Sequence, residues 1–374
     1  MAGGSYLFFV AAAALLAGTG VLCLFAKPVA DWLKVFDYPR GGRKHHASPT
    51  PQVGGFAIVV PVGLWLGLRV ILAPGAIEPL DLAALLCGGG MATLGIMDDQ
   101  SHLSAGGRIL VLAFFALIAF ALDPRLAITQ VHWASFASTH APAWLFILIA
   151  TLAITGFASS VNMADGIDGL VPAAFLMWCA GFAVFTDGET RWIALALMGP
   201  LAIVLAFNLR GKLFLGDCGT FGIGFAIALM ALTALATGSL KPETLLVWFA
   251  LPVIDCVRVI ATRILRGRSP LRGGKDHFHH VLAEIFGKKR AFYGYASLIF
   301  STSLAAALAP AFAIDLLIGL TAVCVGFVTA KHVVGQRRIA KLSGTAPPRA
   351  AAIPLERNLA RGSASPLSGR QTDF

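Results

Sequence analysis

Long apolar segments alternate with short polar ones along the whole chain. A transmembrane helix needs roughly 17–25 consecutive, mostly apolar residues, and runs of that length recur from the first residues to position 330. The pattern therefore predicts an all-α, polytopic integral membrane protein with about eleven transmembrane helices. The predicted spans are 5–26, 53–73, 80–97, 107–122, 142–160, 170–186, 191–208, 218–237, 243–262, 293–310 and 312–330.

Composition agrees with a chain that lies in lipid. Of the 374 residues, 57% are hydrophobic and 13% are charged, and the mean hydropathy is +0.79, whereas soluble domains carry about 25% charged residues. The first span lacks the basic n-region of a signal peptide and is longer than an h-region, so we interpret it as an uncleaved helix. The six cysteines show neither a disulfide framework nor zinc-ribbon spacing.

The net charge of +10 is distributed in a way that indicates a membrane rather than nucleic acid. Lys and Arg cluster in alternate loops, most densely between residues 258 and 290, and the intervening loops are short and nearly free of positive charge. This positive-inside pattern predicts an N-terminus outside and a C-terminus in the cytoplasm. We expect a membrane domain over residues 1–335 and a disordered cytoplasmic tail over residues 342–374, which is rich in Pro, Ala, Ser and Arg.

The polar motifs all fall on loops that this topology places inside. Each of their carboxylates, taken alone, could be no more than a solvated loop charge. Five carboxylates on one face favour a single functional site, because charges near a membrane are costly unless they have a role. The five loops are "DYPRGGRKHHASPTPQVGG" (37–55), "MDDQSHLSAGGR" (97–108), "NMADGIDG" (162–169), "NLRGKLFLGDCGTFG" (208–222) and "RILRGRSPLRGGKDHFHH" (263–280).

The residue types in these loops indicate phosphoryl transfer. Aspartate and asparagine oxygens suit Mg²⁺, or Mn²⁺ as an alternative, and the neighbouring basic side chains suit phosphate-bearing substrates. Together they are typical of metal-assisted phosphoryl transfer. The chain has no Walker, Rossmann, GxSxG or HExxH motif, which excludes soluble NTPases, Rossmann enzymes, serine hydrolases and zincins. For His277, His279 and His280 we favour anion binding over zinc binding or a passive surface role, because no cysteine or second histidine group lies nearby.

The order and spacing of the motifs resemble those of one family. The first loop follows D-x-P and then R-K-x-H-x-x-P-T-P-x-x-G-G, with one extra residue before Arg43, and the second follows D-D, L-S-A and a basic residue. "NMADGIDGL" matches N-x-x-D-G-x-D-G-L in full, and "FLGDCGT" differs from F-L-G-D-x-G-S at Thr220. Across residues 37–280 the chain thus resembles the polyprenyl-phosphate N-acetylhexosamine-1-phosphate transferases, and is most similar to the bacterial branch that uses UDP-N-acetylglucosamine and undecaprenyl phosphate.

The fifth loop departs from the family pattern S-P-F-x-A-D-R-x-H-x-H-H at two positions. Leu271 replaces phenylalanine, and Gly274 stands where the family has aspartate, with Asp276 two positions later. Either Asp276 substitutes for that aspartate or its contact is dispensable. Within the family, phospho-N-acetylmuramoyl-pentapeptide transferase is the alternative, but its fifth loop has three consecutive histidines and it lacks the R-K-x-H-x-x-P-T-P stretch.

The resemblance implies transfer of N-acetylglucosamine 1-phosphate from UDP-N-acetylglucosamine to undecaprenyl phosphate, with release of UMP. It implies a site at the cytoplasmic face of the bacterial inner membrane, and it leaves the sugar and a homodimer open. Mg²⁺ would be held by Asn162 and Asp217. The catalytic residues would be Asp98 and Asp99, near the lipid phosphate, and Asp168. The substrate-binding residues would be Asp37, Arg43, Lys44, Arg108, Asp165, Arg263, His277, His279 and His280.

Two other classes of membrane protein also place carboxylates among helices. A transporter would carry them near the bilayer midplane on broken helices, whereas here they cluster at one face. An intramembrane aspartyl protease would use a G-x-G-D pattern, but Phe214 lies two residues before Gly216. Both classes are disfavoured by the positions of the aspartates.

Overall fold

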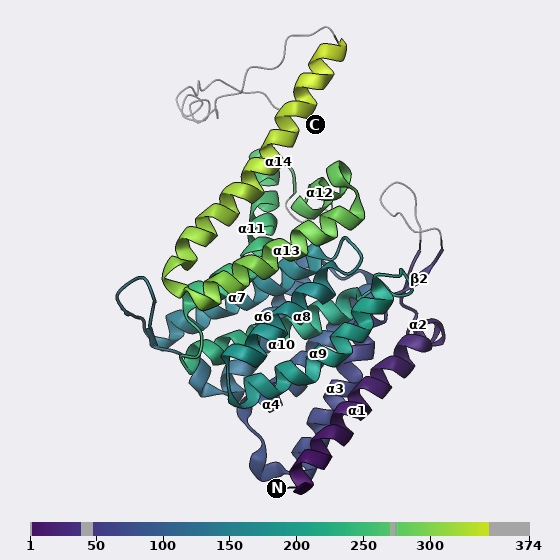
Figure 1. Ribbon diagram of the computed structural model, residues 1–374, viewed down its shortest axis with the longest axis vertical. Coiled ribbons are helices and arrows are strands. Elements are labelled where there is room, and N and C mark those ends of the chain that lie inside the picture. Colours follow the sequence, from purple (N-terminus) through teal and green to yellow (C-terminus); the bar gives the residue numbers. More distant parts are fainter. Residues whose placement is uncertain (1, 39–47, 270–273, 275, 344–374) are drawn as a thin grey trace, which may run out of the picture. The chain divides into compact units, whose positions relative to one another are not determined.

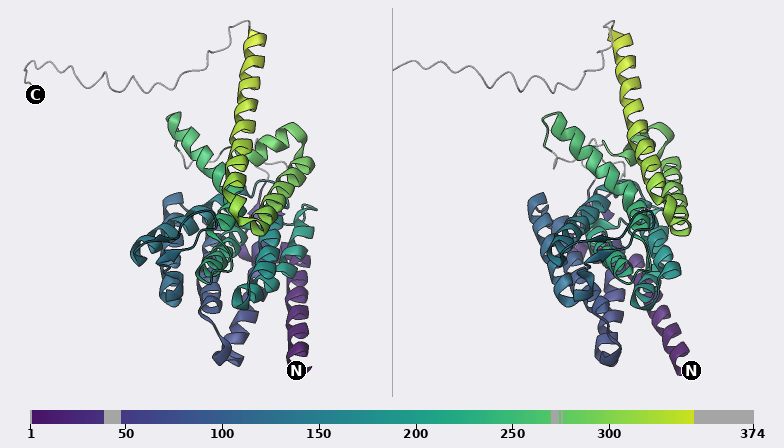
Figure 2. Two further views of the ribbon diagram at one scale, coloured as in Figure 1. Left: turned by 60° about the vertical axis from the view of Figure 1, so that its left-hand side comes forward. Right: turned by 90° about the vertical axis from the view of Figure 1, so that its left-hand side faces the viewer.

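The computed structural model describes residues 2–38, 48–269, 274 and 276–343. The chain divides into two compact units, Met1–Val325 and Gly326–Phe374. In the first unit the helices pack side by side (Figure 1), with α1 along one edge of the bundle (Figure 2). Helix α14 belongs to the first unit up to Val325, and the second unit contains its continuation to Ser343.

The described part of the chain is helical apart from two short hairpins. The helices are α1 Ala2–Leu24, α2 Ala26–Leu33, α3 Gly54–Leu72, α4 Pro79–Ala83, α5 Gly89–Ser101, α6 Ala105–Leu122, α7 Ala143–Ala164, α8 Leu170–Phe185, α9 Gly188–Asn208, α10 Gly216–Ala236, α11 Pro242–Leu265, α12 Phe278–Phe286, α13 Lys288–Leu308 and α14 Ala313–Ser343. A π-helical stretch, Ala84–Gly88, joins α4 to α5. The antiparallel strand pairs are β1 Phe36–Asp37 with β2 Thr50–Pro51, and β3 Gln130–Val131 with β4 Thr139–His140.

The prediction of an all-α polytopic membrane protein is confirmed. Within the described residues, nine helices are long and apolar enough to cross a membrane. The first predicted span, 5–26, coincides with α1, and α2 follows it at an angle of 75°. The predicted span at 170–186 is the apolar helix α8, whose 16 residues are fewer than those of the nine. Every predicted span thus coincides with a helix, and the orientation of the termini stays a prediction.

Helix α10 is the centre of the first unit. Its apolar stretch is 83% buried, against 22% for α6, and it packs against α3, α5, α7 and α8. Glycines permit this close approach: a Cβ on Gly55 of α3 would overlap the backbone of Gly219, and a Cβ on Gly95 of α5 would overlap that of Asp217. The N-terminal turn of α10, which carries Asp217, is therefore held against the ends of two other helices.

Backbone hydrogen bonds join the first polar loop to the fourth. Gly54 and Gly55 donate their N–H groups to the carbonyls of Phe214 (2.9 Å) and Leu215 (2.7 Å), and Phe214 donates to Pro51 (2.8 Å). These bonds occupy N–H groups at the start of α3, which have no partner within the helix. They place the segment that leads into α3 beside the segment that leads into α10.

Candidate functional site

A cavity of about 1020 Å³ lies where the polar loops of the first unit meet. Four segments that are distant in sequence form its wall: the end of the first loop, the α7–α8 turn, the α9–α10 loop, and α12 with the start of α13. Residues of the first, third, fourth and fifth polar loops thus meet at one cavity, and the second loop, 97–108, contributes none of the lining residues. The lining residues are Asp37, Gln52, Asn162, Asp165, Gly166, Ile167, Asp168, Asn208, Gly211, Phe214, Gly216, Asp217, His280, Ala283, Glu284, Gly287 and Lys288.

Asp217 and Asn162 meet on this wall from different helices. The Asn162 side-chain amide donates to Asp217 Oδ1 at 2.6 Å and to the Thr220 hydroxyl oxygen at 2.9 Å. Asp99 lies directly behind them: its Oδ2 accepts the backbone N–H of Asp217 at 2.9 Å, and its Oδ1 accepts from Gln52 Nε2 at 3.2 Å. Asp99 thus ties the end of α5 to the start of α10 and to the first loop.

Asp98 has a different environment from its neighbour. It is 3% exposed, pairs with the Arg108 guanidinium at 2.6 Å and accepts the Leu103 backbone N–H at 2.7 Å. Both contacts lie in the connection between α5 and α6. The structure therefore brings Asp98 and Arg108 to each other, and neither residue is part of the cavity wall.

The "NMADGIDG" segment begins in the last residues of α7, which ends at Ala164, and continues as a turn. Gly169, with φ of 83°, begins α8, and its N–H donates to the Asn208 side-chain oxygen, while Asn208 Nδ2 donates to the Leu213 carbonyl at 2.9 Å. Asp165 and Asp168 line the cavity from this turn. Burial, and secondarily the nearby Asp168 carboxylate, raise the pKa of Asp165 to about 7.

Helix α12 brings only one of its three histidines to the cavity, His280. His277 is 6% exposed, and its Nδ1 lies 3.0 Å from Asp255 Oδ2. His279 is fully buried against Gly166, where a Cβ would overlap its Nε2. Loss of water contact, and then the neighbouring His280, lower the pKa of His279 to about 3, so its ring is neutral.

The fifth loop brings Asp276 to Arg263. Arg263 Nη2 lies 3.4 Å from Asp276 Oδ2, and a Cβ at Gly274 would lie 2.6 Å from Arg263 Nη2 and 3.1 Å from Asp276 Oδ2. The Asp276 carboxylate is therefore beside position 274, where the family pattern has its aspartate. Of the other residues singled out in the sequence, Asp37 lines the cavity, and Arg43, Lys44, Leu271 and Lys275 lie outside the described residues.

Residues 82–235 match the model of glycosyl transferase family 4. The undecaprenyl-phosphate alpha-N-acetylglucosaminyl 1-phosphate transferase of Salmonella typhi is 29% identical over 293 residues, which cover 73% of this chain and 76% of the relative. The protein of the same name in Escherichia coli K12 is 28% identical with the same coverage. A probable undecaprenyl-phosphate N-acetylglucosaminyl 1-phosphate transferase of Bacillus subtilis is 26% identical, covering 70% of this chain and 73% of the relative.

The chain is thus similar to glycosyl transferase family 4 over residues 82–235. The matched region runs from α4 to the end of α10, so it contains the whole aspartate cluster and the α7–α8 turn. Helix α12 and its histidines lie beyond it. The cavity is therefore completed by two segments outside the matched region, the first loop and α12 with the start of α13.

Five residues at or behind the cavity were not singled out from the sequence. Gln52 and Asn208 are neutral amides whose side chains bridge loops, and only Asn208, at the end of an apolar helix, carried a recognisable signal. Glu284 and Lys288 reach the cavity from segments that follow the last motif. Asp255 is a carboxylate inside an apolar run, "LPVIDCVRVI", which is by itself a reason to expect a function.

The residues on the wall fit a magnesium ion shared with substrate. In the described part of the chain, no three or more His, Cys, Asp or Glu side chains form a group that could hold a metal by themselves. Mg²⁺ is usually held by one or two protein carboxylates together with substrate phosphates and water. One carboxylate and one amide oxygen, from Asp217 and Asn162 on the cavity wall, agree with that mode of binding.

Proposed function

We propose that the protein transfers N-acetylglucosamine 1-phosphate from UDP-N-acetylglucosamine to undecaprenyl phosphate, giving the undecaprenyl diphosphate-linked sugar and UMP. One observation carries the proposal: Asn162 of α7 and Asp217 of α10 meet on the wall of a large cavity that Asp165 and Asp168 also line. The names of the relatives support the acceptor and the sugar. The product would be the first lipid-linked intermediate of a cell-envelope polysaccharide.

The reaction requires positioning more than acid–base chemistry. An oxygen of the lipid phosphate attacks the β-phosphorus of the UDP-sugar, and the bond from that phosphorus to the oxygen bridging to the α-phosphate breaks, leaving its electron pair on UMP. A phosphate monoester has a second pKa of about 6 and is mostly dianionic at pH 7. The nucleophile therefore needs little help from a base, and the protein must align two anions that repel each other.

The residues at the cavity have distinct roles in this proposal. One carboxylate oxygen of Asp99 accepts the backbone N–H of Asp217, and the other accepts the side-chain amide of Gln52. Asp99 therefore orients these two residues. Asp98 and Arg108 hold the α5–α6 connection in place. Asp165 and Asp168 orient substrate groups from the α7–α8 turn. When bound by Asn162 and Asp217, Mg²⁺ would neutralise charge that develops on the diphosphate.

The test is a reaction of the purified protein with UDP-N-acetylglucosamine and undecaprenyl phosphate. We expect UMP and lipid-linked sugar in equal amounts, only when both substrates are present. UDP-N-acetylgalactosamine and UDP-N-acetylmuramoyl-pentapeptide are the donors to compare. The proposal is wrong if UMP appears without the lipid, or if UDP-N-acetylglucosamine is inert while another donor reacts.

We infer further that the cavity faces the cytoplasm, because the loops around it carry the excess of positive charge. Ser48 and Ser269 lie on those loops, and Ala137 lies in the connection between β3 and β4; all three are exposed. In intact cells, a membrane-impermeant thiol reagent should label Ala137→Cys and spare Ser48→Cys and Ser269→Cys. Labelling of either serine position without permeabilisation would reverse the orientation.

A further inference from the structure

Asp255 is a buried carboxylate that the reaction described above does not use. It lies in the second half of α11 and is 2% exposed. A carboxylate in such surroundings is strongly destabilising unless hydrogen-bond donors and a cation surround it. The contacts of Asp255 therefore indicate why the chain keeps it.

Three donors converge on Asp255. Its Oδ1 accepts the backbone N–H of Phe278 at 2.9 Å and the Arg258 guanidinium at 2.7 Å, and its Oδ2 lies 3.0 Å from His277 Nδ1. Arg258 also donates to the backbone carbonyl of Asp276. The Asp255–Arg258 ion pair lies within α11. The other contacts join α11 to residues 276–278, where α12 begins.

Helix α12 has no side-chain cap of its own. The first N–H groups of a helix need acceptors from outside the helix, and a negative charge at that end is favourable. Asp255 supplies both, since it accepts the N–H of the first helical residue. A carboxylate opposite Nδ1 of His277 also keeps the proton on that nitrogen and fixes the ring orientation.

From His277 a row of rings leads to the cavity. The His277 and His279 rings are stacked, with centroids 5.6 Å apart and planes 14° apart, and the His279 and His280 centroids are 4.2 Å apart. His279 packs against Gly166, the residue of the α7–α8 turn that follows Asp165. His280 lines the cavity. Helix α12 and the α7–α8 turn both line the cavity, and their positions thus depend on where α12 begins.

We propose that Asp255 is a positioning residue of the transferase site: through Phe278 N–H and His277 it holds α12 so that His280 faces the cavity. The inference rests on the proposed function for its kinetic consequence, but the placement of α12 can be measured without any reaction. Asp255 touches no substrate in this scheme.

The same helix offers a matched control. Glu243, in the first turn of α11, is fully buried, and its Oε1 accepts the backbone N–H groups of Ala134 (2.7 Å) and Ser135 (2.9 Å) at the other end of α11. Glu243→Gln and Asp255→Asn make the same change of carboxylate to amide at equally buried sites. A general loss of packing would affect both variants alike.

Hydrogen exchange is the first test and needs no activity. Asp255→Asn should accelerate amide exchange in residues 278–286 and leave residues 130–140 unchanged, and Glu243→Gln should do the reverse. Unchanged exchange in residues 278–286 would overturn the proposal. Failure to release UMP in the wild type would instead contradict the proposed function and leave this comparison standing.

Kinetics are the second test. Partners that orient a metal-ligating histidine are worth about 10- to 100-fold. On that scale we expect kcat/KM to fall at least about tenfold in Asp255→Asn and to stay within about twofold in Glu243→Gln. If Asp255 acts through His280, then Asp255→Asn should cost little more in a His280→Ala background, because residues in one network are not additive. Independent, multiplying losses would overturn the proposal. His277→Ala, which keeps the Asp255–Arg258 ion pair, repeats this cycle if Asp255→Asn does not fold.

Discussion

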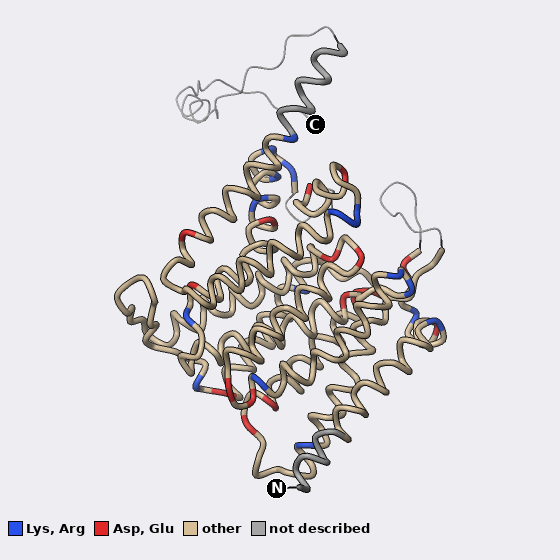
Figure 3. The backbone as a smooth tube through the Cα atoms, viewed as in Figure 1, with Lys and Arg blue, Asp and Glu red and all other residues tan. Residues whose placement is uncertain are grey.

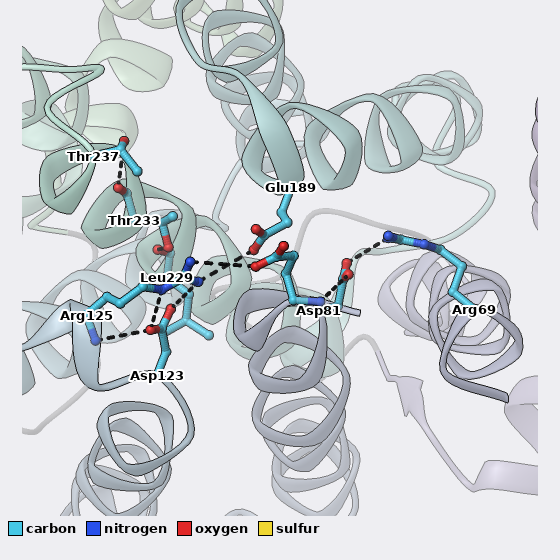
Figure 4. A network of polar contacts seen from close by, with 9 residues as sticks. Arg69, Asp81, Asp123, Arg125, Glu189, Leu229, Thr233 and Thr237 are labelled. Atoms are coloured by element: carbon cyan, nitrogen blue, oxygen red, sulfur yellow. Dashed lines mark hydrogen bonds and ion pairs between the residues drawn. The ribbon is translucent and has the colours of Figure 1, made fainter. Parts of the chain in front are cut away.

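At the end of the helices away from the cavity, carboxylates from several segments gather around arginines (Figure 4). Arg125 lies 2.8 Å from Asp123, 3.6 Å from Glu78 and 3.9 Å from Glu189, and Asp81 pairs with Arg69 at 2.7 Å. Asp81 and Asp123, the two most buried of these carboxylates, are 0% and 1% exposed. Their charges are compensated within the protein.

At the cavity the arrangement is different. Asp165, Asp168 and Asp217 line it, and none of them pairs with a described Lys or Arg. Among the described lining residues, Lys288 is the only Lys or Arg. Figure 3 shows that acidic residues gather at separate places in the first unit, with others scattered along the chain. Ion pairing therefore distinguishes a structural cluster from the candidate site, because carboxylates that no Lys or Arg neutralises can receive a metal ion with its phosphates.

The sharpest way to break this comparison is to make one substitution in both clusters. Asp217→Asn should lower turnover by at least about 10²-fold, the scale of losing one preorganised electrostatic contact. Asp123→Asn should leave turnover near the wild-type rate and lower thermal stability, because it removes the carboxylate closest to Arg125. UMP release at several Mg²⁺ concentrations measures the first effect. A wild-type rate and wild-type Mg²⁺ dependence in Asp217→Asn would place the metal elsewhere.

The packing that brings Asp217 to the cavity predicts the next effect. Gly95→Ala adds a methyl group where the Asp217 backbone lies, and overpacking of this kind costs about 1–3 kcal/mol. We expect a lower melting temperature, and a loss of turnover of about tenfold or more because a displacement of about 1 Å at the site can cost about 10²-fold. Gly89→Ala, on the same helix with open space around it, is the control. Equal behaviour of the two variants would show that the contact with α10 is unimportant.

The fifth loop predicts an intermediate effect. If Asp276 replaces the family's aspartate beside Arg263, then Asp276→Ala should lower kcat/KM several-fold, and Gly274→Asp should be tolerated because only the ends of two flexible side chains have to move. The double variant Gly274→Asp with Asp276→Ala should recover activity. Full activity in Asp276→Ala would mean that the loop works without that carboxylate.

Lys288 should give the smallest effect. It is exposed and lines the cavity, and its neighbour Lys289 is equally exposed and is not part of the wall. Lys288→Ala should raise KM for the UDP-sugar by a few-fold, since an exposed charge contact is worth about 0.2–1 kcal/mol, and the difference should shrink at high salt. Lys289→Ala is the control. The same KM in both variants would assign Lys288 to the membrane surface instead.

Much of the candidate site could be predicted from single motifs. The aspartate pairs, Asn162 and Asp217 stand in short patterns at the ends of apolar runs, so their chemistry and their common side followed from local sequence and charge. The residues that hold these side chains in place could not be predicted in this way. Gln52 is one polar residue among many in its loop, and its contact with Asp99 crosses 47 positions of sequence.

The histidine cluster illustrates the same limit. Three histidines within four positions predicted anion binding for the group, yet only His280 reaches the cavity, because α12 turns the other two toward Asp255 and Gly166. A helix presents successive side chains to different faces, so residues adjacent in sequence acquire different environments. Which face is buried depends on the helices that pack against it.

The sequence by itself determined the membrane class, the positions of the helices and the family chemistry, because apolar length, charge bias and motif spacing are local properties of the chain. The tertiary structure alone decided which carboxylates are compensated and which face the cavity. Asp98 and Asp99 are adjacent in sequence, but one closes an ion pair with Arg108 and the other supports Asp217. That division arises from close packing at Gly55 and Gly95, where contact between distant helices determines which carboxylate oxygens find a partner within the protein.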